Sequence, residues 1–130
     1  MTDPTASAAA PDLPDPREGI FVIERPWGQF QQFVSNEQCT VKIITVQPGH
    51  RLSLQKHGNR GEFWHVLDVP IEVQVDDETW VAQPGEHVWV PCGAVHRMTN
   101  KGDAPGRLLE IAYGDFDEAD IERLHDDYTR

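Results

Sequence analysis

Apolar and polar residues alternate with a period of two over most of the chain between residues 20 and 112. This alternation is typical of strands that bury one face. The runs that show it, or that are short and apolar, lie at 20–24, 40–46, 52–57, 62–67, 71–75, 79–82, 87–90 and 107–112. Glycine and proline separate these runs at pairs such as Pro84-Gly85 and Pro105-Gly106. Many short strands joined by turns predict an all-β sandwich or barrel.

The last segment of the chain follows a different period. Ile121, Leu124 and Tyr128 recur at i, i+3 and i+7, and acidic residues crowd the positions that would form a first helical turn. We therefore predict a single short C-terminal α-helix over roughly 117–127, laid against the sheet.

The first 18 residues carry no periodic apolar pattern. They contain four prolines, several alanines and scattered acids, a composition typical of disordered segments. The chain of 130 residues shows no internal repeat and no second domain. We predict a disordered tail over 1–18 and a single folded domain over 19–130.

The charge of the chain excludes several classes of partner. With 11 basic and 22 acidic residues, the formal net charge is −11, which argues against nucleic acid and against anionic membranes. No apolar run approaches the ~20 residues that span a bilayer, and the N-terminus lacks the basic and apolar regions of a secretory signal. Cys39 and Cys92 are too few for a disulfide scaffold. The sequence therefore predicts a cytoplasmic protein with reduced thiols.

Four potential metal ligands stand close together in the predicted strands. Gln55 and His57 are two residues apart, so they share one face of a strand, and Glu62 opens the next strand. His96 must arrive from a later strand. Two imidazoles, one carboxylate and one amide oxygen suit a single divalent metal ion, which could be Zn²⁺ but also Fe²⁺, Mn²⁺, Co²⁺ or Ni²⁺.

The spacing around these four residues resembles the two motifs of the cupin superfamily. Gly49-x5-Gln55-x-His57-x4-Glu62 is similar to the first motif, with glutamine in place of its first histidine. The second motif is matched at every fixed position by Gly85-x5-Pro91-x-Gly93-x2-His96-x3-Asn100. The resemblance implies a double-stranded β-helix, or jelly roll.

Further segments resemble one branch of that superfamily, the type II mannose-6-phosphate isomerases. They are Arg25-Pro26-Trp27-Gly28, residues 41–49, residues 52–64, residues 90–97 and the ending that starts at Glu118. In that family the cupin is often the C-terminal part of a bifunctional protein that also carries a sugar-nucleotide transferase. Because no such domain precedes residue 20 here, we expect a stand-alone cupin.

The resemblance implies a metal-dependent aldose–ketose isomerase that interconverts mannose-6-phosphate and fructose-6-phosphate or a related sugar. Gln55, His57, Glu62 and His96 match the family's metal ligands, with zinc foremost. Ser53 and Arg60 match its phosphate-contacting groups, and Arg97 follows the last ligand. We therefore expect Arg97 and Glu62 to act in catalysis, with Ser53, Arg60, Arg97 and Trp64 binding the sugar or sugar phosphate.

Two features leave the assignment open. Val69 replaces the glycine that usually closes the first motif, and it resists positive φ, so the turn there must be rebuilt. The catalytic base is not identified: Glu62, His65, His87 and a metal-bound water are all candidates. A neutral sugar is a possible substrate, because the net charge does not favour a sugar phosphate.

Two other functions remain as alternatives to the isomerase. One is a different cupin metalloenzyme, such as an iron-dependent oxygenase, although such enzymes more often present three histidines where this chain has Gln55. The other is a non-catalytic cupin that binds metal and sugar. At the level of the family we also expect a homodimer, with the strands near 20–34 as its interface.

Overall fold

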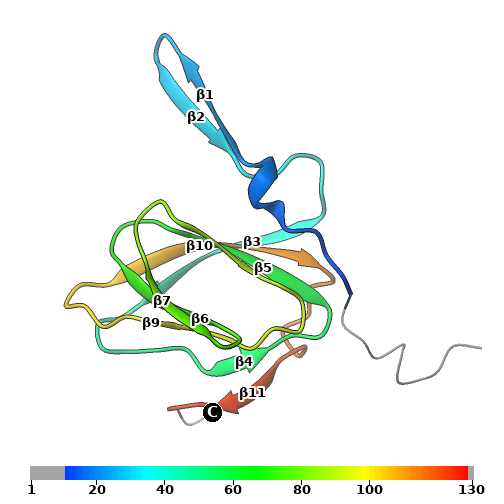
Figure 1. Ribbon diagram of the computed structural model, residues 1–130, viewed down its shortest axis with the longest axis vertical. Helices are drawn as coiled ribbons and strands as arrows, with labels where there is room; N and C mark the ends of the chain where they lie inside the picture. Colours follow the sequence, from blue (N-terminus) through cyan, green and yellow to red (C-terminus); the bar gives the residue numbers. More distant parts are fainter. Residues whose placement is uncertain (1–10, 129–130) are drawn as a thin grey trace, which may run out of the picture.

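The computed structural model describes residues 11–128, and Figure 1 shows how their strands are arranged. The elements are a 3-10 helix η1 (Pro16–Gly19) and the strands β1 (Phe21–Arg25), β2 (Gly28–Gln32), β3 (Cys39–Val46), β4 (Leu54–Lys56), β5 (Arg60–Val66), β6 (Ile71–Val75), β7 (Glu78–Ala82), β8 (His87–Val90), β9 (His96–Thr99), β10 (Gly106–Gly114) and β11 (Glu122–His125). Residues 1–10 of the predicted tail lie outside this range, and the described chain starts before the predicted boundary at residue 19.

The strands form two facing sheets and a separate hairpin. One sheet has the order β3-β10-β5-β8 and the other the order β11-β4-β9-β6-β7, with every pair antiparallel. The β1–β2 hairpin extends away from both sheets (Figure 1). This arrangement is the predicted jelly roll, so the all-β prediction is confirmed.

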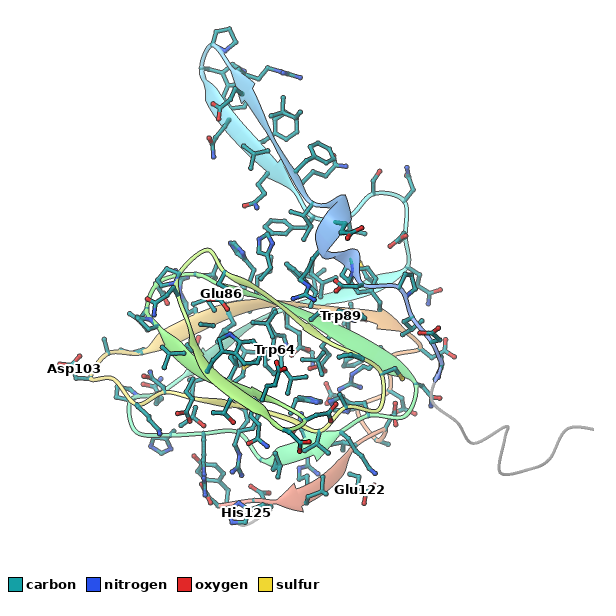
Figure 2. All side chains as sticks on the ribbon, in the orientation of Figure 1. Trp64, Glu86, Trp89, Asp103, Glu122 and His125 are labelled. Carbon is teal, nitrogen blue, oxygen red and sulfur yellow. The ribbon has the colours of Figure 1, made fainter. Side chains whose placement is uncertain are left out.

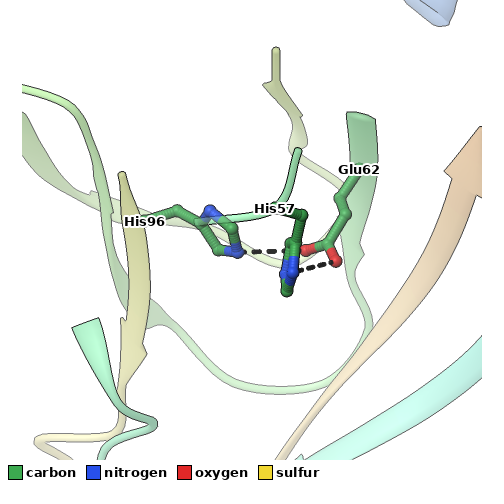
Figure 3. A group of neighbouring side chains, drawn as sticks. All are labelled: His57, Glu62 and His96. Atoms are coloured by element: carbon green, nitrogen blue, oxygen red, sulfur yellow. Dashed lines mark ion pairs between the residues drawn. The ribbon is translucent and has the colours of Figure 1, made fainter. Parts of the chain in front are cut away.

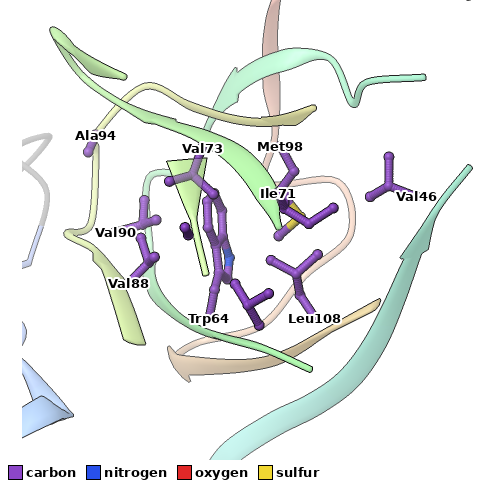
Figure 4. Close-up of a cluster of buried hydrophobic side chains, with 11 residues drawn as sticks. Val46, Trp64, Ile71, Val73, Val88, Val90, Ala94, Met98 and Leu108 are labelled. Carbon is purple, nitrogen blue, oxygen red and sulfur yellow. The ribbon is translucent and has the colours of Figure 1, made fainter. Parts of the chain in front are cut away.

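The main core fills the space between the two sheets. Its side chains come from the inward positions of both sheets and include Trp64, Ile71, Val73, Met98 and Leu108 (Figure 4). Each of these five is at most 1% exposed. The two-residue period of the strands therefore places one apolar set inside, as expected for a sandwich.

A second, smaller cluster covers the outer face of the first sheet. Phe63, Trp89 and Ile111 point outward from three strands, and Leu13, Ile20 and Phe33 from the N-terminal region pack on them. The residues before β3 therefore cover one face of the sheet that carries Glu62.

The predicted C-terminal helix is wrong, because residues 122–125 form strand β11. β11 pairs with β4, matching Glu122 with Lys56 and Arg123 with Gln55, so it extends the second sheet at its edge. An isolated helix of about ten residues is marginal in water, whereas an open sheet edge offers a complete ladder of backbone hydrogen bonds. The apolar spacing of Ile121, Leu124 and Tyr128 was therefore not a helical signal.

The turn at Val69 is rebuilt without a left-handed residue. Among residues 11–128, the non-glycine residues with positive φ are Asn36 and Asp76, and Val69 is not one of them. Instead, the Asp68 carboxylate accepts hydrogen bonds from the backbone N–H of Arg107 (2.8 Å) and from its Nε (2.6 Å). A side-chain clamp replaces the glycine of the family pattern.

A matched pair of valine substitutions tests this core. Val73 on β6 is fully buried, and Val81 on the neighbouring β7 is 52% exposed. Val73→Ala removes buried methyl groups and leaves a cavity, so it should lower the free energy of unfolding by about 2 kcal/mol. Val81→Ala should change it by less than about 0.5 kcal/mol. Urea unfolding of both variants measures the two values, and equal losses would contradict this placement of the core.

Candidate metal centre

The four predicted ligands come from both sheets and meet between them. Gln55 on β4 stands opposite His96 on β9 in the second sheet. Glu62 lies on β5 of the first sheet, and His57 lies in the loop that joins β4 to β5. Figure 3 shows the two imidazoles directed at the Glu62 carboxylate.

The two histidines contact different oxygens of the same carboxylate. His57 Nε2 lies 3.2 Å from Glu62 Oε2, and His96 Nε2 lies 3.4 Å from Glu62 Oε1. One ligand atom from each of the three residues lies within 4.8 Å of the others. All three side chains are at most 3% exposed. The arrangement is therefore a compact set of donors closed off from water.

Backbone carbonyls fix the orientation of both imidazoles. His57 Nδ1 lies 2.7 Å from the carbonyl oxygen of Asp120, and His96 Nδ1 lies 2.9 Å from that of Ala94. A carbonyl oxygen only accepts, so each Nδ1 carries the proton and each Nε2 can present a lone pair to the centre. Outer hydrogen bonds of this kind orient metal-ligating histidines in proteins.

The electrostatics of the cluster fit a bound cation. Among the described residues, His96 Nε2 is buried without a hydrogen-bond partner, and burial lowers the pKa of His96, which favours the neutral imidazole. Burial also raises the pKa of Glu62, but a hydrogen bond that His57 Nε2 donates when the imidazole is protonated, together with the nearby positive charges, lowers it to about 2. The Glu62 carboxylate and the lone pair of His96 Nε2 therefore face each other without a hydrogen-bond donor between them. A divalent metal ion would accept electron pairs from both groups.

Gln55 completes the set through an amide that Ser53 orients. Gln55 Nε2 lies 3.3 Å from His57 Nε2, and the Ser53 hydroxyl donates to Gln55 Oε1 at 2.6 Å. Exchanging the amide oxygen and nitrogen would turn the oxygen toward the centre, and the Ser53 hydroxyl would then accept from the amide. Ser53 is 1% exposed, so it contacts the ligand set rather than open solvent.

Arg60 and Trp64 also contact the Glu62 carboxylate. Arg60 Nε lies 3.2 Å from Glu62 Oε2, and Trp64 Nε1 donates to Glu62 Oε1 at 3.2 Å. Arg60 is 5% exposed and Trp64 is 1% exposed. Arg60 and Trp64, two of the four residues predicted to bind substrate, therefore lie at the cluster, but Trp64 belongs to the main core and is buried. Figure 2 shows Trp64 inside the barrel.

Arg97 does not join the cluster. It follows His96 on β9, so its side chain leaves the opposite face of the strand. There, Arg97 Nε donates to the carbonyl of Leu52 at 2.9 Å, and Arg97 Nη2 lies 2.9 Å from His125 Nδ1. Figure 2 shows His125 on the outer edge strand. In this structure Arg97 supports the packing of β11 on the second sheet.

Glu110 is an acidic residue that the sequence analysis did not select. It lies on β10 opposite Trp64, so it shares the inward face of the sheet with Trp64 and Glu62. Glu110 is 5% exposed, and no hydrogen bond to its carboxyl group occurs among residues 11–128. Burial, and then the charge of Glu62, raise the pKa of Glu110 to about 7. The alternation of Leu108, Glu110 and Ala112 was the signal that it faces inward.

Residues 115–121, which we call the C-terminal strap, connect β10 to β11 (Figure 1). Besides the Asp120 carbonyl on His57, the Asp117 carbonyl accepts from Arg60 Nη1 at 3.0 Å. A groove of about 420 Å³ runs between the strap and the loop that carries His57. The strap therefore forms one wall of the groove beside His57.

Asp120 fixes the loop that carries His57. Its carboxylate accepts from the backbone N–H groups of Gly58 (2.8 Å) and Asn59 (2.9 Å). Asp120→Asn weakens this clamp, so it should lower metal affinity by about 10- to 100-fold in a chelator competition. Glu122→Gln removes an exposed carboxylate two residues away and should leave the affinity unchanged. Equal affinity in both variants would show that Asp120 does not position the ligand.

Comparison with known proteins places the chain in a family. Residues 18–126 match the family described as "Mannose-6-phosphate isomerase C-terminal". The chain belongs to this family. Alginate biosynthesis protein AlgA of Pseudomonas aeruginosa is 39% identical over 83% of the chain, and mannose-1-phosphate guanylyltransferase ManC of Salmonella typhimurium is 36% identical over 83%. In each case the match takes up 23% of the relative's length, so the chain corresponds to under a quarter of these relatives.

Solved structures support the fold of this family member. Oxalate decarboxylase of Bacillus subtilis, an enzyme with Mn(II) centres, is 26% identical with a TM-score of 0.61 over 68% of this chain and 24% of its own. A Klebsiella pneumoniae protein with a double-stranded β-helix domain is 16% identical with a TM-score of 0.59, over 69% of this chain and 77% of its own. These matches confirm the cupin jelly roll.

Among the described residues, no helix combines the length and the apolar character needed to cross a membrane.

Proposed function

We propose that this family member is a metal-dependent aldose–ketose isomerase that interconverts mannose-6-phosphate and fructose-6-phosphate, or a related sugar pair. The observation that carries the proposal is the buried set of His57, Glu62 and His96, whose Nε2 atoms both face one carboxylate. The family description, which names mannose-6-phosphate isomerase, supplies the substrate class.

In this proposal Gln55, His57, Glu62 and His96 hold one divalent metal ion. Two imidazoles and a carboxylate are a common ligand set for catalytic zinc, so zinc is the first choice, with manganese, iron, cobalt and nickel as alternatives. When bound, the metal ion supplies positive charge that polarises the sugar carbonyl and stabilises an enediolate. Arg60 adds a second positive charge beside Glu62, at the same end of the barrel.

We assign the proton transfer to Glu110, because the isomerisation moves one proton between C1 and C2 of the sugar. A carboxylate removes the proton from C2 of the aldose, a second proton passes from the C2 hydroxyl to the C1 oxygen within the enediolate, and the carboxylic acid then returns the first proton to C1 to give the ketose. Glu110 is buried, has no hydrogen bond among the described residues and faces the same space as Glu62. Its pKa of about 7 suits a group that must both accept and donate near neutral pH.

A direct assay tests the isomerase. The protein is loaded in turn with each divalent metal, and its conversion of mannose-6-phosphate, fructose-6-phosphate, free mannose and free fructose is followed. We expect turnover with at least one metal and one sugar pair, and loss of turnover after chelation. A fully metal-loaded protein that converts none of these sugars would contradict the proposal.

A non-catalytic cupin that binds metal and sugar is the second candidate. One observation favours it: Arg60 and Trp64 already contact the Glu62 carboxylate, and the whole cluster is closed to solvent. Such a protein would bind metal and sugar in calorimetry while staying inactive in the assay. An iron-dependent oxygenase would instead consume O₂ when loaded with Fe²⁺.

We also propose that the chain forms a homodimer through the β1–β2 hairpin. Phe21, Val22 and Phe30 on this hairpin are 40–45% exposed, although they are large and apolar. Val41 and Ile43 on the edge strand β3 are more than half exposed and offer a matching apolar strip for a second copy. Light scattering should give the mass of a dimer, and Val41→Asp with Ile43→Asp should give a monomer. A monomeric parent protein would contradict this.

A further inference from the structure

His65 and His87 form a cross-strand pair that the proposed mechanism does not use. Both were candidates for the catalytic base, but His65 lies on the face of β5 opposite that of Glu62 and Trp64. His87 on β8 stands directly opposite His65, so both imidazoles lie on the outer face of the first sheet. The sheet itself therefore separates this pair from the metal centre.

The spacing of the two rings matches that of a pair already proposed as metal ligands. The ring centroids of His65 and His87 lie 5.0 Å apart, with an interplanar angle of 52°. Those of His57 and His96 lie 4.9 Å apart at 47°. Two imidazoles that bind one Zn²⁺ tetrahedrally, with Zn–N distances of about 2.1 Å, have centroids roughly 5.2 Å apart. The outer pair therefore has the spacing of two imidazoles that share one ion.

Two nitrogens of the pair lack a good hydrogen-bond partner. Among residues 11–128, His65 Nδ1 is one of two buried side-chain atoms of this kind, and the other is His96 Nε2 of the metal centre. His87 Nε2 has a contact of 3.5 Å with Gln31 Nε2, which is at the outer limit for a hydrogen bond. A buried nitrogen without a partner is costly, and a bound cation would remove that cost.

The end of β2 packs against the pair. The ring centroid of Phe33, just after β2, lies 5.1 Å from that of His65, and Gln31 on β2 reaches His87. Exchanging the oxygen and nitrogen of the Gln31 amide would turn the oxygen toward His87 Nε2. Two imidazoles and one amide oxygen, from three different strands, are then available to one ion.

The surroundings favour the neutral form of both imidazoles, which is the form that binds a metal ion. Burial, and then His87, lower the pKa of His65, and burial, and then Arg17, lower the pKa of His87. The Asp15 carboxylate accepts from Arg17 Nε at 3.0 Å and from its Nη2 at 2.6 Å, so the nearby positive charge is compensated. The net charge of −11 also favours the approach of a cation.

We propose that His65, His87 and Gln31 form a second metal site, which takes a divalent cation such as Zn²⁺ and ties the β1–β2 hairpin to the first sheet. Imidazole ligands suit Zn²⁺, Cu²⁺ and Ni²⁺. Because Gln31 belongs to the hairpin and both histidines belong to the sheet, one ion joins the two parts of the molecule. The site has no carboxylate, so it binds more weakly than the first centre and fills only in excess metal.

Zinc titration in a background without the first centre tests this site. His57→Ala is the background, because it removes a ligand of that centre. Adding His65→Ala or His87→Ala should weaken zinc binding by at least ~10-fold, because a direct ligand matters more than an outer hydrogen bond. Adding His125→Ala on β11, whose side chain is 54% exposed, should leave zinc affinity unchanged. Equal zinc affinity in all of these variants would overturn the second site.

The stoichiometry of the protein with His57 intact gives a second measurement, and neither measurement requires turnover of a sugar. After reloading with excess zinc, the parent should hold about two equivalents per chain and His87→Ala about one. Equal zinc content in these two proteins would overturn the second site. One equivalent in the parent and none in His87→Ala would support the second site and contradict the first centre.

Hydrogen exchange tests whether the ion ties the hairpin to the sheet. Zinc should slow the exchange of backbone amides in β2 of the His57→Ala protein, because the bound ion holds Gln31. The same addition should have no effect on β2 when His87→Ala is also present. Exchange in β2 that zinc leaves unchanged in His57→Ala would overturn the role of Gln31.

Discussion

Replacing His57 with alanine should remove the metal from the purified protein. The parent protein should carry about one equivalent of metal per chain, and His57→Ala should lose at least ~100-fold in affinity, more than the loss of an outer hydrogen bond costs. His57 is the ligand that touches both Glu62 Oε2 and, through Nδ1, the strap. Elemental analysis after purification without chelator gives the stoichiometry, and a chelator competition gives the affinity.

An exposed histidine provides the matched control. His125 lies on β11, has a 54% exposed side chain and contacts Asp127 rather than the ligand cluster. His125→Ala should keep the metal content of the parent. Loss of metal in both variants would indicate a general effect on folding, which circular dichroism would reveal. A parent protein that takes up no divalent ion after reloading would contradict both the metal centre and the isomerase.

The sequence predicted the bounds of the strands that bury one face in the core, because burial of one face produces the two-residue period. The strands at 71–75 and 87–90 were predicted with the observed bounds because each has a turn at both ends and a face that enters the core. The hydrophobic pattern did not delimit β2, although strands near 20–34 were expected from the family, because both faces of β2 are largely exposed. Without a buried face, Gly28–Gln32 carries no two-residue period to detect.

The C-terminal error has a different physical cause. Periodicity reports which residues share a face, but it does not report whether a free sheet edge lies within reach. β4 offers that edge, and Asp120 ties the preceding residues to the loop of His57. Both contacts are long-range, so no local pattern near residue 120 contains them.

Some residues of the candidate site could be predicted from the sequence, and others could not. Donor chemistry and the resemblance to the cupin motifs predicted Gln55, His57, Glu62 and His96 as ligands, and the structure brings these four side chains together. The two-residue period of a strand puts Arg97 on the opposite face from His96, and the prediction that Arg97 acts in catalysis did not take this period into account. Glu110 was not selected, because it lies outside the two cupin motifs; its alternation with Leu108 and Ala112 indicated an inward position, and its register with Trp64 shows it.

Replacing Glu110 with glutamine should lower isomerase turnover by about 10²- to 10⁴-fold, the usual contribution of a general acid–base. The amide keeps the size of the side chain but cannot accept and return the proton. Because Glu110 is separate from the four ligands, the variant should keep the metal content of the parent. Glu72→Gln, on the outward side of β6 beside Lys101, is the control that should retain full turnover.

The dependence of kcat/KM on pH in the parent protein also tests the role of Glu110. Glu110 must be deprotonated to act as a base, so kcat/KM should fall as the pH drops through the pKa of this carboxyl. That pKa is raised to about 7, by burial first and by the charge of Glu62 second. A bound cation adds positive charge nearby, so the acidic limb should lie at or below pH 7. Glu110→Gln should lose this limb, and a variant that keeps both the limb and the parent turnover would show that another group moves the proton.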